Sequence, residues 1–435
     1  MFAGSPSSGA IAQGLLAATA CWGVLRLRRA ALVAAAYKAK ILCSTIFISR
    51  RNVDPETAPE VSADHYLPLR LFHAKVDLQE KSVKASFFGL WPRKAAYRQG
   101  PAAAGAPERQ APAPKEPAAL RDFLDAAFME PDSDRLRRTR AIVLLQDGRV
   151  IAERYAPGFS AVTPLPGWSM TKSVLGALIG ILVREGRLAP QDKSLLAQWA
   201  DDSRSEISLE DLLRMRSGLK FVENYSDLSS DVIQMLFIRP DAARYAASLP
   251  LEYSPGSRWS YSSGTTNILS AIARKAVGEG DYPSWPSRVL FNPLGMDSAV
   301  LEADASGTFV CSSFMHASAR DWARFGQLYL QDGVWMGKRI LPEGWAGFAA
   351  QPTPQSPEER YGAHWWLKLQ KELGGLSEAA ARIPADAFHA LGHEGQALTV
   401  IPSRGLVAVR LGLSIRIDAW NHAEFLAGML DAIGA

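Results

Sequence analysis

The chain has 435 residues, 48% hydrophobic and 21% charged, so it is long enough for one large globular domain or two medium ones. Its formal net charge of +4 originates at the N-terminus, because residues 1–51 contain seven Lys or Arg and no Asp or Glu. Without these seven, 41 basic residues face 44 acidic ones, which excludes nucleic-acid binding by charge. Only Cys311 lies beyond residue 51, which excludes a disulfide framework there.

Residues 1–51 are expected to be a membrane-associated or targeting segment, with a location in the cell envelope. Ala10 to Leu25 are uncharged and mostly apolar, and the basic cluster Arg26 to Arg29 follows. This stretch of roughly 16 residues is shorter than the about 20 that span a bilayer. A secretory signal carries its positive charge before the apolar stretch, which is not the order here. An interfacial helix, a short signal anchor, a transit peptide and a frayed tail remain open.

Residues 52–118 are expected to be an extension that ends in a linker. Alternating patches between residues 66 and 90 fit a hairpin. From Pro92 to Leu120 the sequence is crowded with Ala, Pro and Gly and has no periodic apolar face. Such a composition predicts a flexible or semi-extended connection before the main domain.

Residues 119–435 show strand signals near both ends. Apolar runs at 141–146 and 149–155 flank Asp147-Gly148, the strongest short hairpin signal. A second pair of apolar runs flanks Pro402 to Gly405. We therefore expect one antiparallel sheet, completed by an N-terminal part (119–172) and a C-terminal part (385–435) of this domain.

Helical patterns fill the sequence between these strands. Residues 173–186 form a strongly apolar helix, residues 321–333 an amphipathic one, and Ser208 makes a capping box with Asp211 before a third. A last helix is expected from Ala419 to Ile433. The predicted class is α+β, with the sheet flanked by helices and a helical subdomain (173–384) inserted. The active site is expected in the cleft between the two parts.

The pattern Ser-x-x-Lys occurs twice, at Ser169 to Lys172 and at Ser217 to Lys220. Ser169 directly precedes the apolar helix, where the helix dipole and free amides favour negative charge. Lys172 falls one turn later on the same face, and partial desolvation would lower its pKa enough for it to accept a proton. Ser217 instead ends its helix before Gly218, so its Lys is expected at the surface. An isolated Ser before a helix is otherwise simply an N-cap.

Other nucleophile systems lack their residues. The sequence contains no Gly-x-Ser-x-Gly elbow, no His-Glu-x-x-His and no paired Cys spacing. Cys311 with nearby His316 could form a thiol pair, but a lone Cys among small residues is far more often a buried filler. No metal or organic cofactor is expected.

Five sequence blocks together resemble the serine β-lactamase-related family, near its class C and 6-aminohexanoate-dimer hydrolase branch. They are WSMTKS (168–173), LLRMRSGL (212–219), YSPGSRWSYSSGTTNILS (253–270), NPLGM (292–296) and GHEGQ (392–396). The resemblance runs from about Thr139 to the C-terminus, and the order of the blocks is more telling than any one of them.

The resemblance implies that Ser169 is the nucleophile, Lys172 its partner and Tyr261 the proton relay to the leaving group. A neighbouring ammonium can stabilise a phenolate, which makes that role chemically sensible. Without Lys172, Tyr261 would be only a hydrogen-bonding aromatic residue in a turn. Ser263 stands where many β-lactamases of this class carry Asn, and this departure weakens a β-lactam assignment.

The third family motif is usually Lys-Thr-Gly or His-x-Gly, and here it is His393-Glu394-Gly395. The resemblance implies that Gly395 lets the substrate lie close to the strand, and that the amides of Gln396 and Ser169 form the oxyanion hole. His393 in place of Lys removes a permanent charge for a substrate carboxylate. His393 alone would be a polar residue in a Gly-rich turn.

Four further residues, Ser263 among them, are expected to bind substrate. Glu223 and Tyr225 resemble an acidic residue and a tyrosine that 6-aminohexanoate-dimer hydrolases bring to the substrate. Tyr225 is equally explained as an exposed loop aromatic. Trp366, next to Trp365, would wall the pocket, although paired Trp residues more often pack in a core.

The expected function is hydrolysis of a small amide or ester substrate through an acyl-enzyme on Ser169. Two alternatives remain open. The first is a β-lactamase or D,D-peptidase, and the second is a membrane-tethered penicillin-binding sensor that turns over slowly. The partners expected are the small substrate and, through the N-terminal segment, a membrane, but no nucleic acid.

Overall fold

The computed structural model of the protein describes residues 8–98 and 116–434. Its chain divides into two compact units. The first contains residues 8–47, 51–97 and 224–238, and the second contains residues 48–50, 98, 116–223 and 239–434. Most of the linker expected between residues 92 and 120 falls on residues 99–115, outside the described residues.

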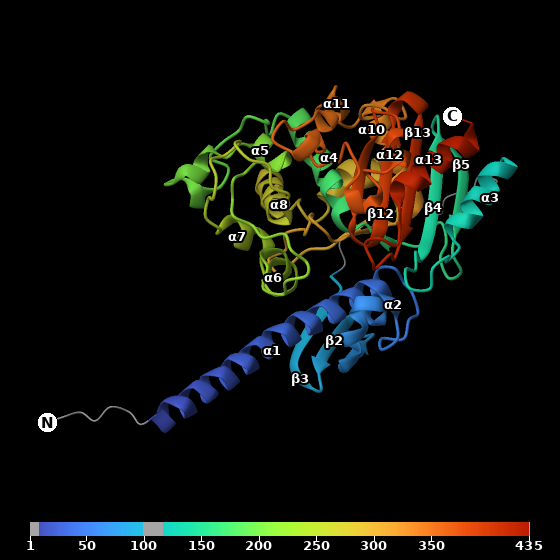
Figure 1. Cartoon of the computed structure of the whole chain (residues 1–435). Coiled ribbons are helices and arrows are strands. Elements are labelled where there is room, and N and C mark those ends of the chain that lie inside the picture. The colour runs from blue at the N-terminus through green and yellow to red at the C-terminus, as the bar shows by residue number, and fades with distance from the viewer. Residues whose placement is uncertain (1–7, 99–115, 435) are drawn as a thin grey trace. The chain divides into compact units, whose positions relative to one another are not determined.

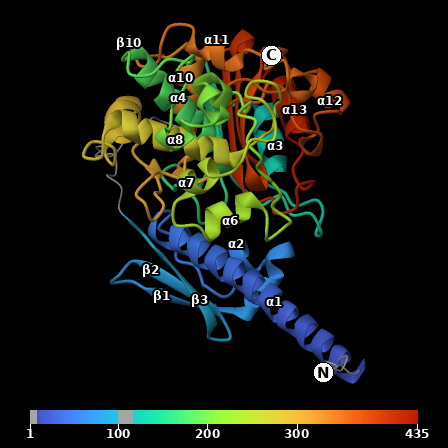
Figure 2. The ribbon, with the colours of Figure 1, turned by 90° about the vertical axis from the view of Figure 1, so that its left-hand side faces the viewer.

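The first unit is a three-stranded antiparallel sheet packed on one long helix. The helix α1 spans Ser8–Phe47, and the strands follow the order β1 (Phe72–Asp77), β2 (Ser82–Phe87) and β3 (Leu90–Ala96). The strands lie along the C-terminal half of α1 (Figure 2), whose Ala35 and Leu42 are fully buried. Lys38 is also buried there, and it pairs with Glu56 at 2.8 Å. The short helix α2 (Pro59–Ser62) completes this part of the unit.

The basic cluster at residues 26–29 does not end the N-terminal helix. Helix α1 continues through it for 40 residues in total, because the Ala-rich stretch after it favours helix and is buried against the sheet. Length and apolar composition would allow Cys21–Phe47 to cross a membrane, and half of its most apolar window is buried within the protein. A signal sequence or the core helix of a soluble protein has the same character.

An internal segment of the expected hydrolase domain belongs to the first unit. Residues 224–238 cluster with the N-terminal elements and contain helix α6 (Asp231–Phe237). The ring of Phe237 packs against the ring of Tyr37 on α1, with 5.3 Å between centroids. Three apolar side chains of α6 are buried: Val232, Ile233 and Met235. The Phe237 ring therefore joins α6 to α1 within this unit.

The second unit is built on a five-stranded antiparallel sheet of order β11-β12-β13-β4-β5 (Figure 1). Its strands are β4 (Thr139–Gln146), β5 (Arg149–Tyr155), β11 (Phe388–Gly392), β12 (Gln396–Ile401) and β13 (Leu406–Gly412). The C-terminal strand β13 pairs with the N-terminal strand β4, as expected. Asp147 and Gly148 both adopt positive φ between β4 and β5, which is the requirement of a type I′ turn. The α+β class with an antiparallel sheet flanked by helices is thus confirmed.

Helices cover both faces of this sheet. On one face, α3 (Ala118–Ala127) and α13 (His422–Ile433) lie side by side and share an apolar core with Ile142 and Leu144 of β4. On the other face, α10 (Ala319–Leu330) packs so closely that a Cβ on Gly326 would lie 2.5 Å from Val407. Both faces of the sheet are therefore covered by helices, and the site lies at its edge strand β11.

The inserted region is mostly helical. Helix α4 is buried from Thr171 to Leu182 and contacts α8, and the expected capping box of Ser208 and Asp211 starts α5. Besides α6 and α10, the helices of the region are α4 (Thr171–Arg184), α5 (Leu209–Leu213), α7 (Ala242–Ala247), α8 (Ser263–Val277), α9 (Asn292–Leu294), α11 (Trp345–Ala350) and α12 (Glu378–Ala381). The short strands of the second unit outside the five-stranded sheet are β6 (Leu165–Pro166), β7 (Val300–Leu301), β8 (Met315–Ala317), β9 (Val334–Trp335) and β10 (Lys338–Arg339).

Candidate active site

Ser169 lies in the 3-10 turn Trp168–Met170 that leads directly into α4. Met170 is the N-cap of α4, and no side chain caps the helix, so the Ser169 hydroxyl is not used as a cap. Trp168 holds a left-handed φ of 48°, which costs a non-glycine residue about 1 kcal/mol and therefore needs support from its surroundings. Ser169 itself is only half-buried, so its hydroxyl stays within reach of a ligand.

The Lys172 amine makes three hydrogen bonds from a buried position. It lies 3.0 Å from Ser169 Oγ, 3.1 Å from Ser263 Oγ and 2.9 Å from the carbonyl oxygen of Ser312. Burial lowers the pKa of Lys172 to about 8, although the charge of Glu223 opposes this. A neutral amine that donates to Ser263 and Ser312 would direct its lone pair at Ser169. The geometry therefore suits proton transfer from the serine.

Ser263 and Glu223 form the layer behind this amine. Ser263 is the first residue of α8 and is fully buried. Glu223 accepts hydrogen bonds from both its amide at 2.8 Å and its hydroxyl at 2.6 Å. Because the Ser263 hydroxyl donates to Glu223, its oxygen is left to accept from Lys172. Both residues, expected at the substrate, thus lie within the network that orients Lys172.

Ser312 also holds the Lys172 amine, a role that the sequence did not indicate. Its carbonyl oxygen accepts from Lys172, and its own amide and hydroxyl are both held by the Asn267 side chain. Neighbouring Cys311 is buried, and burial raises the pKa of its thiol to about 12, so it is a filler rather than a nucleophile. A backbone carbonyl can come from any residue type, so no sequence signal marks it.

Tyr261 lies beside both Ser169 and Lys172. Its ring lies 4.9 Å from the Lys172 nitrogen. Burial and the charge of Glu223 raise the pKa of Tyr261, while a side-chain hydrogen bond with Ser169 lowers it. The phenol is therefore a neutral hydrogen-bonding group beside the nucleophile at ordinary pH.

Aromatic rings fix the position of Tyr261. Trp366 packs against it with 5.4 Å between ring centroids, and Trp259 and Tyr361 surround the pair. Trp366, expected to line the pocket, thus contacts the proposed proton relay. Trp365 is fully buried and packs instead with Tyr329 and Phe388 in the core.

The third motif forms the turn between β11 and β12. His393–Gly395 make a 3-10 turn in which Glu394 and Gly395 both have positive φ. The Glu394 carboxylate accepts a hydrogen bond from Trp168 Nε1 at 3.0 Å, and the His393 ring meets the Trp168 ring edge-on. A Cβ on Gly392 would lie 2.2 Å from the Gly167 carbonyl oxygen. The motif is therefore brought against the turn that carries Ser169.

The strand register bears on which amide of this turn faces the site. His389 exchanges both backbone hydrogen bonds with Trp366, on the side of β11 away from β12. Alternation along the strand turns the His393 amide to that same outer side, whereas Gly392 pairs with Gln396 across the hairpin. The Gln396 side chain is buried and bonds both backbone groups of Gly412.

Tyr225, which was expected to bind substrate, belongs to the first compact unit, whereas Ser169 belongs to the second. In the second Ser-x-x-Lys, Ser217 lies four residues beyond the end of α5 and bonds Thr265, while Lys220 is exposed. That motif is therefore no second nucleophile site.

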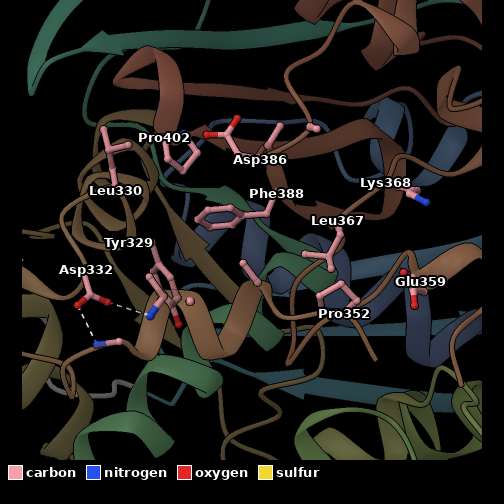
Figure 3. Close-up of a pocket in the computed structure, with 16 residues that line it drawn as sticks. Tyr329, Leu330, Asp332, Pro352, Glu359, Leu367, Lys368, Asp386, Phe388 and Pro402 are labelled. Atoms are coloured by element: carbon pink, nitrogen blue, oxygen red, sulfur yellow. Dashed lines mark hydrogen bonds between the residues drawn. The ribbon is translucent and has the colours of Figure 1, made fainter. Parts of the chain in front are cut away.

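A separate pocket of about 730 Å³ lies in the second unit (Figure 3). Tyr329, Phe388 and Leu367 line it, and none of the catalytic candidates does. Its Asp332 accepts hydrogen bonds from the amides of Gly344 and Ala346, so this carboxylate is used to order the loop before α11. The pocket is distinct from the cluster around Ser169.

Fold and site together define a hydrolase with the β-lactamase/transpeptidase architecture. Residues 124–412 match the Beta-lactamase family, and the chain belongs to this family. It is similar to the 6-aminohexanoate-dimer hydrolase of Paenarthrobacter ureafaciens, at 27% identity over 325 residues, which cover 68% of this chain and 79% of that protein. The resemblance to that branch is thereby confirmed, and the protein is a hydrolase enzyme.

Solved structures show the same fold. A putative 6-aminohexanoate-dimer hydrolase from Bacillus anthracis superimposes with a TM-score of 0.57 at 20% identity, over 89% of this chain and 95% of that one. A family VIII carboxylesterase superimposes with a TM-score of 0.56 at 15% identity, over 75% of this chain and 99% of that one.

Proposed function

We propose that this enzyme cleaves an amide or ester bond of a small substrate through an acyl-enzyme on Ser169. The observation that carries the proposal is the 3.0 Å contact between the buried amine of Lys172 and the accessible hydroxyl of Ser169. A pKa lowered to about 8 leaves a useful fraction of neutral amine near neutral pH. Such a pair is an activated nucleophile.

In the first step, Ser169 Oγ attacks the substrate carbonyl carbon and Lys172 accepts the hydroxyl proton. Tyr261 then donates a proton to the departing amine or alcohol as its bond to carbon breaks, and Lys172 restores the phenol proton. Water attacks the acyl-enzyme with the same groups as base and acid, which returns Ser169 to its hydroxyl form. These steps use only the three side chains, the substrate and water.

The oxyanion of each tetrahedral intermediate is stabilised by the Ser169 amide and one amide of the turn 393–396. Each such donor typically contributes about 3 kcal/mol to transition-state stabilisation. Gln396 was the residue expected from the family pattern. The alternation along β11 favours the amide of His393 as the second donor.

The test compares Ser169→Ala with Ser217→Ala, the serine of the other Ser-x-x-Lys. We expect Ser169→Ala to abolish hydrolysis of a p-nitrophenyl ester and labelling by a fluorophosphonate, with its fold intact by circular dichroism. Ser217→Ala should retain both activities. Hydrolysis by Ser169→Ala at the wild-type rate would refute the nucleophile.

A substrate panel separates the remaining functions. Rapid turnover of esters or linear amides supports the proposal. Penicillin turnover would instead support a β-lactamase or D,D-peptidase, and a stable covalent penicillin label without turnover would support a sensor. Ser263 at the position of the usual Asn, and His393 at that of the usual Lys, favour the first outcome.

We also propose that the N-terminal part of α1 binds a membrane, in keeping with a location in the cell envelope. Trp22, Val24, Leu25 and Leu27 are exposed apolar side chains on α1, and the basic cluster lies among them. Arg26 stacks on Trp22 at 3.9 Å, an arrangement suited to the membrane interface. The full chain should sediment with anionic vesicles, and replacing Arg26, Arg28 and Arg29 by Gln should release it. Equal sedimentation of both chains would exclude this electrostatic attachment.

A further inference from the structure

The guanidinium group of Arg410 lies directly behind the third motif. Arg410 is on β13 and is fully buried. It donates to Gly395 O at 2.9 Å and to Glu394 O at 3.4 Å. A Cβ on Gly395 would come within 2.6 Å of this guanidinium, so the turn is shaped around it. Both carbonyls belong to residues with positive φ, the part of the motif that most needs external support.

The rest of the guanidinium is held in place by groups outside the motif. Its other acceptors are Arg137 O, Thr139 Oγ1 and Ser414 Oγ, and its face lies 4.3 Å from the Trp420 ring. All five acceptors of Arg410 are uncharged, so the cation is not neutralised by a bonded carboxylate. Burial lowers its pKa to about 9, which still leaves it protonated at neutral pH.

The turn held by Arg410 is connected to the nucleophile. Glu394 accepts from Trp168 Nε1 at 3.0 Å, a bond between residues 226 positions apart in the chain. Trp168 immediately precedes Ser169 and has the left-handed backbone described above. Arg410 thus contacts the Glu394 backbone, and the Glu394 side chain contacts the residue next to Ser169.

We infer that Arg410 is a positioning residue for acyl transfer, which fixes the Glu394–Gly395 turn and, through Trp168, the nucleophile beside it. This inference rests on the proposed acyl-enzyme function. Arg410 is too deeply buried to touch substrate, so its effect is on geometry and on the potential at the turn. Its buried cation also places positive charge behind a motif whose first residue is His393 rather than Lys.

The test replaces Arg410 by Met in the full chain and measures hydrolysis of an ester and of the matching thionoester. The two substrates differ in the atom that enters the oxyanion hole, so the ratio of their rates reports the alignment of its donors. A misplaced turn should lower kcat for the ester roughly 10- to 100-fold with little change in KM. The preference for the oxygen substrate should shrink in the same variant.

Arg214→Met is the matched control. Arg214 is also buried, donates to the carbonyls of Phe348 and Gln351, and stacks on the Phe348 ring at 4.6 Å; unlike Arg410 it also pairs with a carboxylate, that of Glu210 at 2.6 Å. Its loss should lower thermal stability in a similar way but leave the rate ratio unchanged. A change of equal size in both variants would make Arg410 merely structural and overturn the inference.

Trp168→Phe tests the other end of the connection and replaces Arg410→Met if that variant does not fold. It removes the Nε1 donor to Glu394 and should reduce kcat and the oxygen preference together. If the folded variants keep the wild-type ratio while Ser169→Ala is inactive, the role of Arg410 is refuted and the acyl-enzyme stands. If Ser169→Ala remains active, the acyl-enzyme itself fails.

Discussion

Glu223 contacts Lys172 through Ser263, whose hydroxyl donates to the carboxylate at 2.6 Å and lies 3.1 Å from the amine. The carboxylate charge raises the pKa of Lys172 and burial lowers it. The Tyr261 ring also lies near this amine, and burial together with the Lys172 charge lowers the pKa of His364 to about 3, so His364 is neutral. An acidic residue one hydroxyl away therefore sets how much neutral lysine is available.

This relationship predicts the pH profile. Because the neutral amine is the base, kcat/KM should rise with pH through a midpoint near the Lys172 pKa of about 8. Glu223→Gln removes the charge that favours ammonium, so the midpoint should move to lower pH. Stopped-flow acylation with a p-nitrophenyl ester measures both profiles. A midpoint that stays in place or moves upward contradicts the assignment.

Replacing Tyr261 by Phe should affect amides far more than activated esters. A departing amine must be protonated, whereas p-nitrophenolate leaves unaided, so we expect anilide hydrolysis to fall roughly 10²- to 10⁴-fold. The ester should lose about tenfold at most. Tyr361→Phe is the control, because the Tyr361 ring packs beside Tyr261 and no proton transfer is assigned to the Tyr361 hydroxyl. Equal losses for both substrates would remove Tyr261 from leaving-group protonation.

Two glycine substitutions should change stability in opposite directions. Gly326→Ala places a Cβ 2.5 Å from Val407 and 2.7 Å from Leu398, and such overpacking costs about 1–3 kcal/mol. Gly347→Ala meets nothing within 4 Å on an exposed turn of α11, where alanine favours helix by up to about 1 kcal/mol. Urea unfolding measures both. A stable Gly326→Ala would show that α10 is less tightly packed on the sheet.

Two buried histidines should make the fold sensitive to acid. Thr399 Oγ1 lies 2.9 Å from both His389 Nδ1 and His422 Nε2, and burial lowers the pKa of His389 to about 3 and that of His422 well below its ordinary value. The unfolded chain binds protons that the native one does not, so stability is present above the ordinary histidine pKa and lost as pH falls below it.

His389→Asn isolates this effect. The titration of His389 should make the free energy of unfolding of the wild-type protein about 2 kcal/mol lower at pH 5 than at pH 7. The variant keeps a hydrogen-bonding group for Thr399 but cannot titrate, so its stability should fall less between the two pH values. Parallel pH dependence of variant and wild type would show that His389 does not contribute.

The fold was predictable where local chemistry determines it. Asp147-Gly148 dictates a hairpin because both residues tolerate positive φ, and Ser208 with Asp211 defines a helix start. The extent of α1 was not predictable, because the basic cluster resembles a boundary while the alanines after it bury against a sheet formed later in the chain.

The candidate site was predictable only in part. Ser169 and Lys172 lie three positions apart in one motif, and their contact follows from helical spacing. The Ser312 carbonyl and the Trp168–Glu394 bond join distant segments through groups that no residue pattern marks. Glu223 was expected at the substrate, but it bonds Ser263 instead. Ser263 lies behind Lys172 because α8 begins there.

Residues 224–238 cluster with the first unit, although they lie inside the stretch that matches the family, and the chain rejoins the second unit at Arg239. The first unit is therefore not an appendage that a single cut or gene fusion at the N-terminus could remove or add. A chain shortened to residues 119–435 would retain α6 without α1, whose Tyr37 ring packs against Phe237. Removing either the N-terminal elements or this internal stretch alone would therefore take away part of one compact unit and leave the other part without its partner.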